Sequence, residues 1–168
     1  TCALPIFFEG REINEFDITK GLQVPLFFPA DSVRVADALL DVLGAGWEHF
    51  WVNEFPWSGN FVLGYIVDFG SVEPNTLVRM RFSLLDPSGN EVGAGAANVA
   101  VPQTTGQMNR SCQAATVSVR VDSVGVYELT IHSGGICLSR YSIEIRLKDG
   151  GTQPISCGAA NRSATPSW

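Results

Sequence analysis

Apolar and polar residues alternate with a period of two through much of the C-terminal half of the chain. This period is typical of a β-strand that has one face on a core and the other in water. The apolar positions of three such runs are Val117, Val119 and Val121; Tyr127, Leu129 and Ile131; and Tyr141, Ile143, Ile145 and Leu147. Ser133-Gly134-Gly135 separates the second run from the third and predicts a hairpin. We expect this stretch to organise the rest of the fold.

Two stretches further upstream also predict strands. Residues 61–69 are almost continuously apolar, which is typical of a strand buried on both faces. Residues 76–85 alternate, with Val78, Met80, Phe82 and Leu84 on the expected inner side and Arg79, Arg81 and Ser83 outside. A turn should follow at residues 86–90, because Pro87 presets φ and Gly89 accepts a positive φ. Residues 22–28 are apolar, but Pro25 lacks a hydrogen-bond donor, so we expect an edge strand at best.

Residues 31–43 fit two kinds of element. Val33, Ala36, Leu39, Leu40 and Leu43 recur at helical spacing, Asp31 or Ser32 could cap the start, and Gly44 could end the helix. Val33 and Val35 also fit a strand. The pattern leaves both a short helix and a strand open.

Together these elements predict an all-β, immunoglobulin-like β-sandwich of about seven to nine antiparallel strands. Asp122, Gly125 and Tyr127 are similar to the turn before strand F of immunoglobulin-like domains, where a tyrosine hydroxyl bonds back to the backbone. Leu129 then stands where antibody domains carry a cysteine, so we expect no inter-sheet disulfide. The expected division is an irregular lead-in over 1–21, a sandwich domain over 22–148 and a flexible tail over 149–168.

Several short motifs, in order, resemble a family of small bacterial proteins of unknown function. They are Val35-Ala36-Asp37-Ala38, Val42-Leu43-Gly44-Ala45-Gly46-Trp47, Phe55-Pro56-Trp57, Leu85-Asp86-Pro87-Ser88-Gly89-Asn90 and Gly125-Val126-Tyr127. In that family an Ala-Asp-Ala strand turns through a hairpin into a second strand that ends in Leu-Gly-x-Gly-Trp. The resemblance spans roughly residues 33–147 and implies a compact β-sandwich with no known activity. The chain lacks most of that hairpin between Ala38 and Val42.

Charge and composition exclude several classes of partner. The formal net charge of −6 argues against a nucleic-acid partner, because phosphate binding needs clustered Lys and Arg. Only Arg79 and Arg81 approach such a cluster, and the face of a solvated strand explains them. No stretch has the roughly 18 apolar residues of a membrane span. Thr1-Cys2-Ala3-Leu4-Pro5-Ile6 resembles a translated sequencing adapter, so we expect the native N-terminus to be missing.

The cysteines do not form a recognisable metal or redox motif. Without Cys2, an odd number remains: Cys112, Cys137 and Cys157. Cys112 and Cys137 could meet across neighbouring strands, but we favour small buried residues in a reducing cytoplasm. No Cys-x-x-Cys spacing suggests zinc, so we expect no metal and no cofactor.

Catalytic constellations are also missing from the sequence. His49 and His132 each stand alone on an expected strand, and no nucleophile elbow or phosphate-binding loop occurs. Asp37 and Asp41 would share a face only if residues 31–43 were helical. We therefore expect a non-enzymatic module that acts by binding or assembly, with a protein partner or a second copy.

A dense group of aromatic residues is the one feature with a positive functional interpretation. Trp47, His49 and Trp51 should project from one face of a strand, with Phe55 and Trp57 beyond the next turn. Trp47, Trp51, Phe55 and Trp57 could form an exposed platform for a sugar or a protein. The alternative is that these rings fill the core. A carbohydrate-binding module is thus the second hypothesis, and it requires at least two of the rings to be coplanar and open to water.

Overall fold

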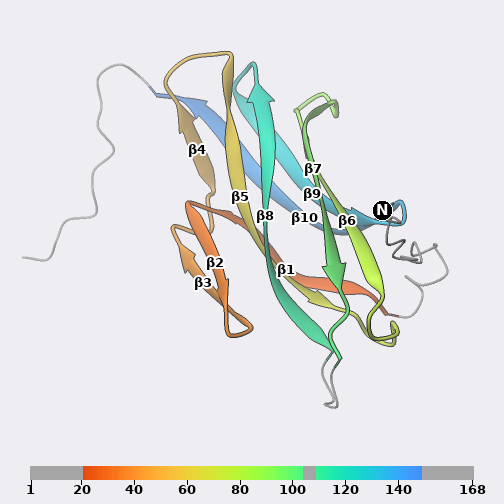
Figure 1. Ribbon diagram of the computed structural model, residues 1–168. Coiled ribbons are helices and arrows are strands. Elements are labelled where there is room, and N and C mark those ends of the chain that lie inside the picture. The colour runs from red at the N-terminus through yellow and green to blue at the C-terminus, as the bar shows by residue number, and fades with distance from the viewer. Residues whose placement is uncertain (1–20, 104–108, 149–168) are drawn as a thin grey trace, which may run out of the picture.

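The computed structural model describes residues 21–103 and 109–148, and these contain strands but no helix (Figure 1). Nearly all of the predicted lead-in and the whole predicted tail lie outside the described residues. The strands are β1 Gln23–Ala30, β2 Ser32–Ala36, β3 Leu39–Leu43, β4 His49–Val52, β5 Trp57–Asp68, β6 Leu77–Leu85, β7 Glu91–Ala100, β8 Arg110–Val121, β9 Gly125–Ser133 and β10 Ile136–Leu147. Accordingly, no described helix could cross a membrane.

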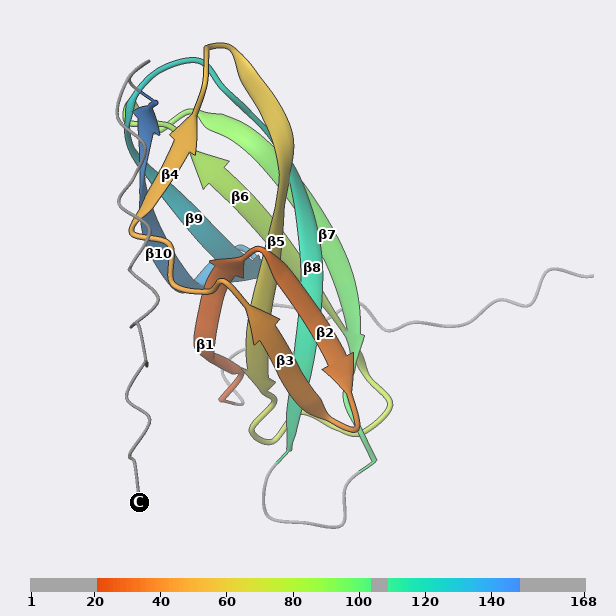
Figure 2. The same cartoon turned by 90° about the vertical axis from the view of Figure 1, so that its left-hand side faces the viewer.

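Eight strands form one curled sheet in the order β1-β5-β8-β7-β6-β9-β10-β4, and β2 and β3 form a separate hairpin. The curl brings β5 and β8 in front of β6, β9 and β10, so the sheet acts as two facing layers (Figures 1 and 2). The layers are joined where β7 pairs with β8, at Gly93–Val119 and Ala94–Ser118. The predicted all-β, immunoglobulin-like sandwich is confirmed, although the described residues form ten strands rather than about seven to nine. One prediction needs correction, because β4 pairs with β10 in parallel rather than antiparallel.

The core lies between the two layers and is built from the alternating residues. Tyr65 of β5 and Phe82 of β6 meet across it, with ring centroids 5.3 Å apart in an edge-to-face arrangement. The predicted inward positions of β6, β8 and β9 are all buried. On β10 the prediction holds for Ile143 and Ile145, whereas Leu147 at the end of the strand is 41% exposed.

Two glycines allow β7 to approach β8 closely enough to join the layers. A Cβ atom on Gly93 would lie 2.6 Å from Val119 Cγ1 and 2.9 Å from the Ser118 carbonyl oxygen. A Cβ atom on Gly95 would lie 3.1 Å from the Thr116 carbonyl oxygen. Any larger residue at Gly93 would therefore force the two strands apart.

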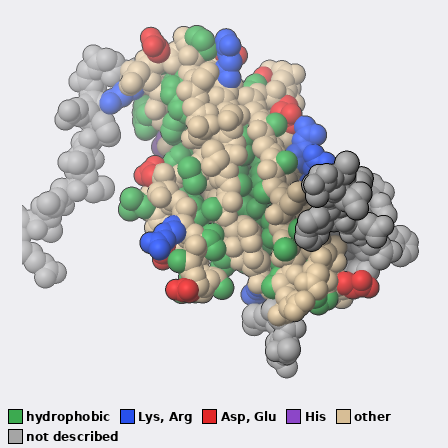
Figure 3. Space-filling view, in the orientation of Figure 1, with side chains coloured by type: hydrophobic (Ala, Val, Ile, Leu, Met, Phe, Trp, Pro, Cys, Tyr) green, Lys and Arg blue, Asp and Glu red, His purple; other side chains and the backbone are tan. Residues whose placement is uncertain are grey.

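Residues 31–43 form a hairpin, so the helical interpretation is wrong and the strand interpretation is confirmed. Asp37 and Ala38 form the turn with φ angles of 51° and 60°, as a two-residue type I′ turn requires. Figure 2 shows the hairpin over the outer side of β5 and β8. Hydrophobic side chains remain visible over it in Figure 3, and Leu39 and Leu43 are 67% and 70% exposed.

The N-terminal strands β1 and β4 each extend a different layer of the sandwich. β1 pairs antiparallel with β5 at the end of one layer, and β4 pairs with β10 at the end of the other. The β2–β3 hairpin lies between them in the chain. This arrangement leaves β4 as the last strand of the sheet, with an outward face next to β10.

Candidate functional site

The outer face of β4, β10, β9, β6 and β7 carries the two most distinctive groups of surface side chains. The Trp51 surface lies at the β4 end and consists of His49, Trp51, Val126, Glu144 and Arg146. The groove lies at the other end, over β6, β7 and β9.

Strand register builds the Trp51 surface. β4 pairs with β10 so that His49 lies beside Glu144 and Trp51 beside Arg146. β10 pairs with β9 so that Glu144 also lies beside Val126. Trp51 and Val126 are 49% and 59% exposed, and the strand register places these two apolar side chains on the same outer face of the sheet.

Charged groups surround the indole ring of Trp51. The guanidinium carbon of Arg146 lies 5.6 Å from the ring centroid, within the range of a cation–π interaction. Arg146 donates a hydrogen bond of 2.5 Å to Glu144, and His49 Nδ1 lies 3.2 Å from the same carboxylate oxygen. The hydrogen bond from Arg146 lowers the pKa of Glu144 below its ordinary value, so Glu144 is ionised at neutral pH.

The other predicted platform rings lie elsewhere. Trp47 stacks on Phe50 at a centroid distance of 5.4 Å, and Trp57 meets Phe50 edge to face at 4.9 Å. Phe61 contacts all three rings, and Phe55 is also packed against the core. The structure thus separates Trp51, which faces outward, from Trp47, Phe55 and Trp57. The expectation that Trp47 shares a face with His49 and Trp51 was wrong, because Trp47 precedes β4 and turns inward onto Phe50.

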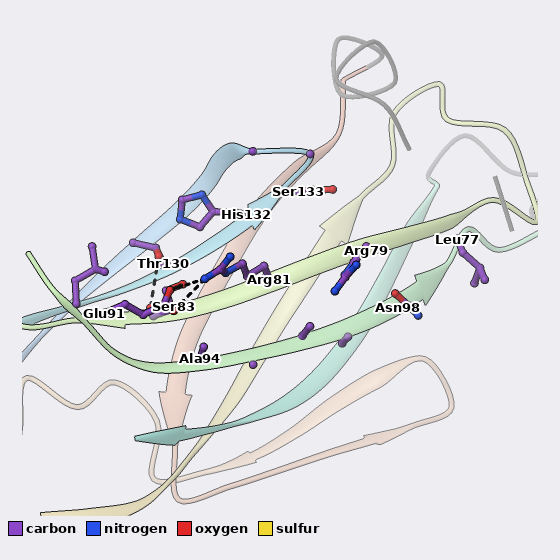
Figure 4. A pocket seen from close by; sticks show the side chains of 16 residues that line it. Leu77, Arg79, Arg81, Ser83, Glu91, Ala94, Asn98, Thr130, His132 and Ser133 are labelled. Carbon is purple, nitrogen blue, oxygen red and sulfur yellow. Dashed lines mark hydrogen bonds and ion pairs between the residues drawn. The ribbon is translucent and has the colours of Figure 1, made fainter. Parts of the chain in front are cut away.

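The groove has a volume of about 1230 Å³ (Figure 4). Small side chains, including Ala94 and Ala96, line it along β7. Arg81 donates two hydrogen bonds of 2.9 Å to Glu91, one to each carboxylate oxygen. Ser83 Oγ donates a third, of 2.6 Å, to Glu91 Oε2. The hydrogen bond from Ser83, aided by Arg81, lowers the pKa of Glu91, so this carboxylate stays ionised.

Two further residues give the groove its charge character. Arg79 is exposed and makes no ion pair or side-chain hydrogen bond with the residues that the structure describes. It lies beside Asn98 in the register of β6 and β7. Burial, together with the charges of Arg140 and Arg81, lowers the pKa of His132, so its imidazole is neutral at pH 7.

The alternating pattern alone predicts that Arg79 and Arg81 lie on a solvated strand face. Two signals were available: the arginines are two residues apart on one face, and residues 94–97 are all alanine or glycine. Neither signal shows that the strand with the arginines, β6, pairs with the strand with the alanines, β7.

No catalytic arrangement brings the two histidines together. His49 lies beside Glu144 on β10, whereas His132 lies beside Cys137, near the opposite end of that strand. Within residues 21–103 and 109–148, no group of His, Cys, Asp and Glu could hold a metal ion. Cys112 and Cys137 are unpaired, on strands that are not neighbours in the sheet.

Three solved structures have distant similarity to the chain. A β-glucuronidase of glycoside hydrolase family 2 aligns with TM-score 0.42 and 12% identity, over 72% of this chain and 12% of the enzyme. The alkylpurine DNA glycosylase AlkC of Pseudomonas fluorescens, bound to DNA containing an abasic-site analogue, aligns with TM-score 0.39 and 10% identity, over 74% of this chain and 30% of the glycosylase. An immunoglobulin-like protein of Pseudomonas aeruginosa aligns with TM-score 0.36 and 13% identity, over 74% of this chain and 96% of that protein. The chain thus spans only a small part of the two enzymes.

The chain matches no curated protein. Residues 25–146 match the model of a family of unknown function, DUF6941, which agrees with the resemblance to an uncharacterised family. The match covers most of the sandwich, including β4, β10 and the strands of the groove. This protein therefore belongs to the DUF6941 family.

Proposed function

We propose that the domain is a non-catalytic assembly module and that its Trp51 surface binds a second copy of the chain. The observation that carries the proposal is the outward position of Trp51, half exposed on the last strand of the sheet, while the neighbouring rings are packed inward. Tryptophan and arginine are the residues most enriched at energetically important interface positions. Trp51 and Arg146 lie in contact here.

The composition of the surface favours a protein over a sugar. Stacking on a sugar ring needs an open aromatic face, and Arg146 lies over the ring of Trp51. No second platform ring accompanies Trp51, because Trp47 and Trp57 contact Phe50 and Phe61 instead. An exposed Val126 adds apolar area that a protein partner would bury.

Charge and symmetry favour a second copy as that protein. The surface holds one carboxylate, Glu144, beside one guanidinium, Arg146. A two-fold axis places the same patch on both partners, so a patch with both charges complements itself. Among the described residues, β4 pairs only with β10, which leaves its other edge available for contact.

The non-catalytic part of the proposal rests on the separation of the reactive side chains. His49 is next to Glu144 and Arg146, but these three groups lie on an exposed sheet face rather than around a cavity. Glu91 in the groove is held ionised by Ser83 and Arg81, which makes it a poor general acid.

Sedimentation velocity over a wide range of protein concentration tests the proposal. We expect the wild-type chain to form dimers as concentration rises and the W51A variant to remain monomeric. L39A is the matched control, because Leu39 is also exposed but lies on the hairpin. Circular dichroism would establish that each variant is folded.

Three results would contradict the proposal. A wild-type chain that stays monomeric has no self-association to explain. Dimers that persist in W51A use another surface. Quenching of tryptophan fluorescence by an oligosaccharide in the wild type, absent in W51A, would instead identify a carbohydrate-binding module.

A further inference from the structure

The groove over β6, β7 and β9 has more positive than negative charge, although the chain as a whole is acidic. Arg79 and Arg81 both lie along it, and Glu91 is the acidic residue among its lining side chains. Arg81 and Glu91 neutralise each other as an ion pair. The guanidinium of Arg79 is left without a partner among residues 21–103 and 109–148, on a protein with a net charge of −6.

The spacing of these groups matches an extended chain. Side chains two residues apart on a strand lie roughly 6.7 Å apart on the same face, so Arg79 and Arg81 have the same repeat as alternate residues of an extended peptide. The lining of the groove extends along β6 from Leu77 to Leu85. Eight strand steps span roughly 27 Å, enough for about eight extended residues.

Small side chains and hydrogen-bonding groups make the groove accessible to a main chain. Ala94 and Ala96 on β7 present only methyl groups beside Ser83 and Arg81, the outward residues of β6 with which they pair. Asn98 lies directly beside Arg79 and carries an amide that can donate to the same carboxylate. Figure 4 shows Arg79 and Asn98 toward one end of the groove, and Arg81, Glu91 and His132 toward the other.

We propose that this groove binds an extended acidic peptide segment of a partner protein, with carboxylates at alternating positions. One carboxylate binds Arg79 and Asn98. The next binds Arg81 through its remaining N–H groups, because both hydrogen bonds to Glu91 come from a single nitrogen of the guanidinium. This inference goes beyond the assembly role of the Trp51 surface and uses a different part of the sheet. Arginine suits this task because its planar fork can hold a carboxylate with two hydrogen bonds.

A peptide fits better than a nucleic acid. A phosphate backbone carries a charge at every unit and needs several free cations in succession. The groove instead alternates a free arginine with an arginine that is paired to Glu91. The net charge of −6 also repels a long polyanion, whereas a short segment with a few carboxylates is held by local contacts.

Fluorescence anisotropy with the full chain tests the proposal. The probe is a fluorescein-labelled peptide of four Glu-Thr repeats, and the comparison peptide has Gln in place of Glu. We expect saturable binding of the acidic peptide that weakens as salt is added. R79A should weaken binding by about tenfold, the usual size of one lost charge-assisted hydrogen-bonding group.

Matched variants separate the groove from general surface charge. Arg34 is another exposed arginine, on the β2–β3 hairpin, so R34A should bind the peptide as the wild type does. R79K keeps the charge but loses the planar fork, and it should recover only part of the affinity. W51A should also bind normally, so the test does not depend on the proposed assembly role.

Four results would overturn the proposal. Absence of saturable binding of the acidic peptide to the wild type is the first, and equal weakening of binding by R79A and R34A is the second. The third is equal binding of the Glu and Gln peptides, which would show that the groove does not recognise the carboxylates. The fourth is binding of an oligothymidylate of eight nucleotides that is tighter than binding of the acidic peptide and is lost in R79A, which would assign the groove to nucleic acid instead.

Discussion

The hydroxyl of Tyr127 donates a hydrogen bond of 2.9 Å to the backbone carbonyl of Ser123, four residues earlier in the chain. The contact closes the turn between β8 and β9 and has the form of the tyrosine corner of immunoglobulin-like domains. The tyrosine ring is buried, while Ser123 is exposed. One side chain thus fixes a surface turn to the core.

Replacing Tyr127 with phenylalanine should destabilise the fold by about 1 kcal/mol, the typical net contribution of one hydrogen bond. The ring stays in the core, so the loss reports the hydroxyl alone. Urea denaturation followed by fluorescence measures the change. Y141F is the control: the Tyr141 hydroxyl donates to the Trp47 carbonyl over 3.3 Å, and its loss should cost less. Equal losses of stability in Y127F and Y141F would mean that the Tyr127–Ser123 hydrogen bond contributes no more than the longer Tyr141–Trp47 bond.

Tyr65 should behave in the opposite way. Its hydroxyl is buried and has no hydrogen-bond partner among the described residues, so Y65F should leave stability unchanged or raise it. A clear loss of stability would show that the hydroxyl has a partner in solution.

The same tyrosine predicts a pH dependence. Burial raises the pKa of Tyr65 to about 12, whereas an unfolded tyrosine titrates near about 10. Between these values the unfolded chain loses a proton that the folded chain keeps, so stability falls as pH rises. Denaturation at several alkaline pH values should show a shallower fall for Y65F than for the wild type. Parallel curves would mean that Tyr65 does not titrate abnormally.

Period-two alternation predicted most of the core because it needs only a strand with one buried face. The alternating apolar residues of β6 and β9 are buried as expected: Val78, Met80, Phe82, Leu84, Tyr127, Leu129 and Ile131. The groove could not be predicted in the same way. Arg79 and Asn98 become neighbours only through the pairing of β6 with β7, which local pattern does not specify.

Two other features could not be predicted from the residues near them in the sequence: the conformation of residues 31–43 and the surroundings of Trp51. The apolar residues of 31–43 fit the period of a helix as well as that of a strand. The turn at Asp37 and Ala38 lacks the glycine that usually marks such a hairpin, and alanine rarely adopts a positive φ. The alternation puts Trp51 on the same face of its strand as His49, but it leaves open whether that face is exposed or buried in the core. Its neighbour Arg146 comes from a parallel pairing with the far end of the chain, so their contact required the tertiary fold.

The turn at Ala38 also predicts a stabilising substitution. Ala38 has a φ of 60°, where an alanine costs roughly 1 kcal/mol and a glycine is unstrained. A38G should therefore stabilise the hairpin by up to about 1 kcal/mol, less the entropy that glycine gains when unfolded. The stabilisation should appear as slower amide hydrogen exchange in β2 and β3 of A38G than in the wild type. A36G is the control, because Ala36 lies in the extended part of β2, where glycine should speed exchange. Faster exchange in A38G would mean that the turn differs from the one described.

The junction of the two layers makes Gly93 the position least tolerant of a side chain. In G93A the new methyl group would lie 2.6 Å from Val119 Cγ1 and 2.9 Å from the Ser118 carbonyl, so backbone must move. Overpacking of this kind costs about 1–3 kcal/mol, and the loss should appear as a lower urea midpoint. A94S is the matched control, because Ala94 is adjacent on β7 but exposed on the groove side, and it should unfold like the wild type. If G93A were as stable as A94S, the close approach of β7 and β8 would not be needed to join the layers. The two halves of the sheet would then be held together chiefly by the core between them.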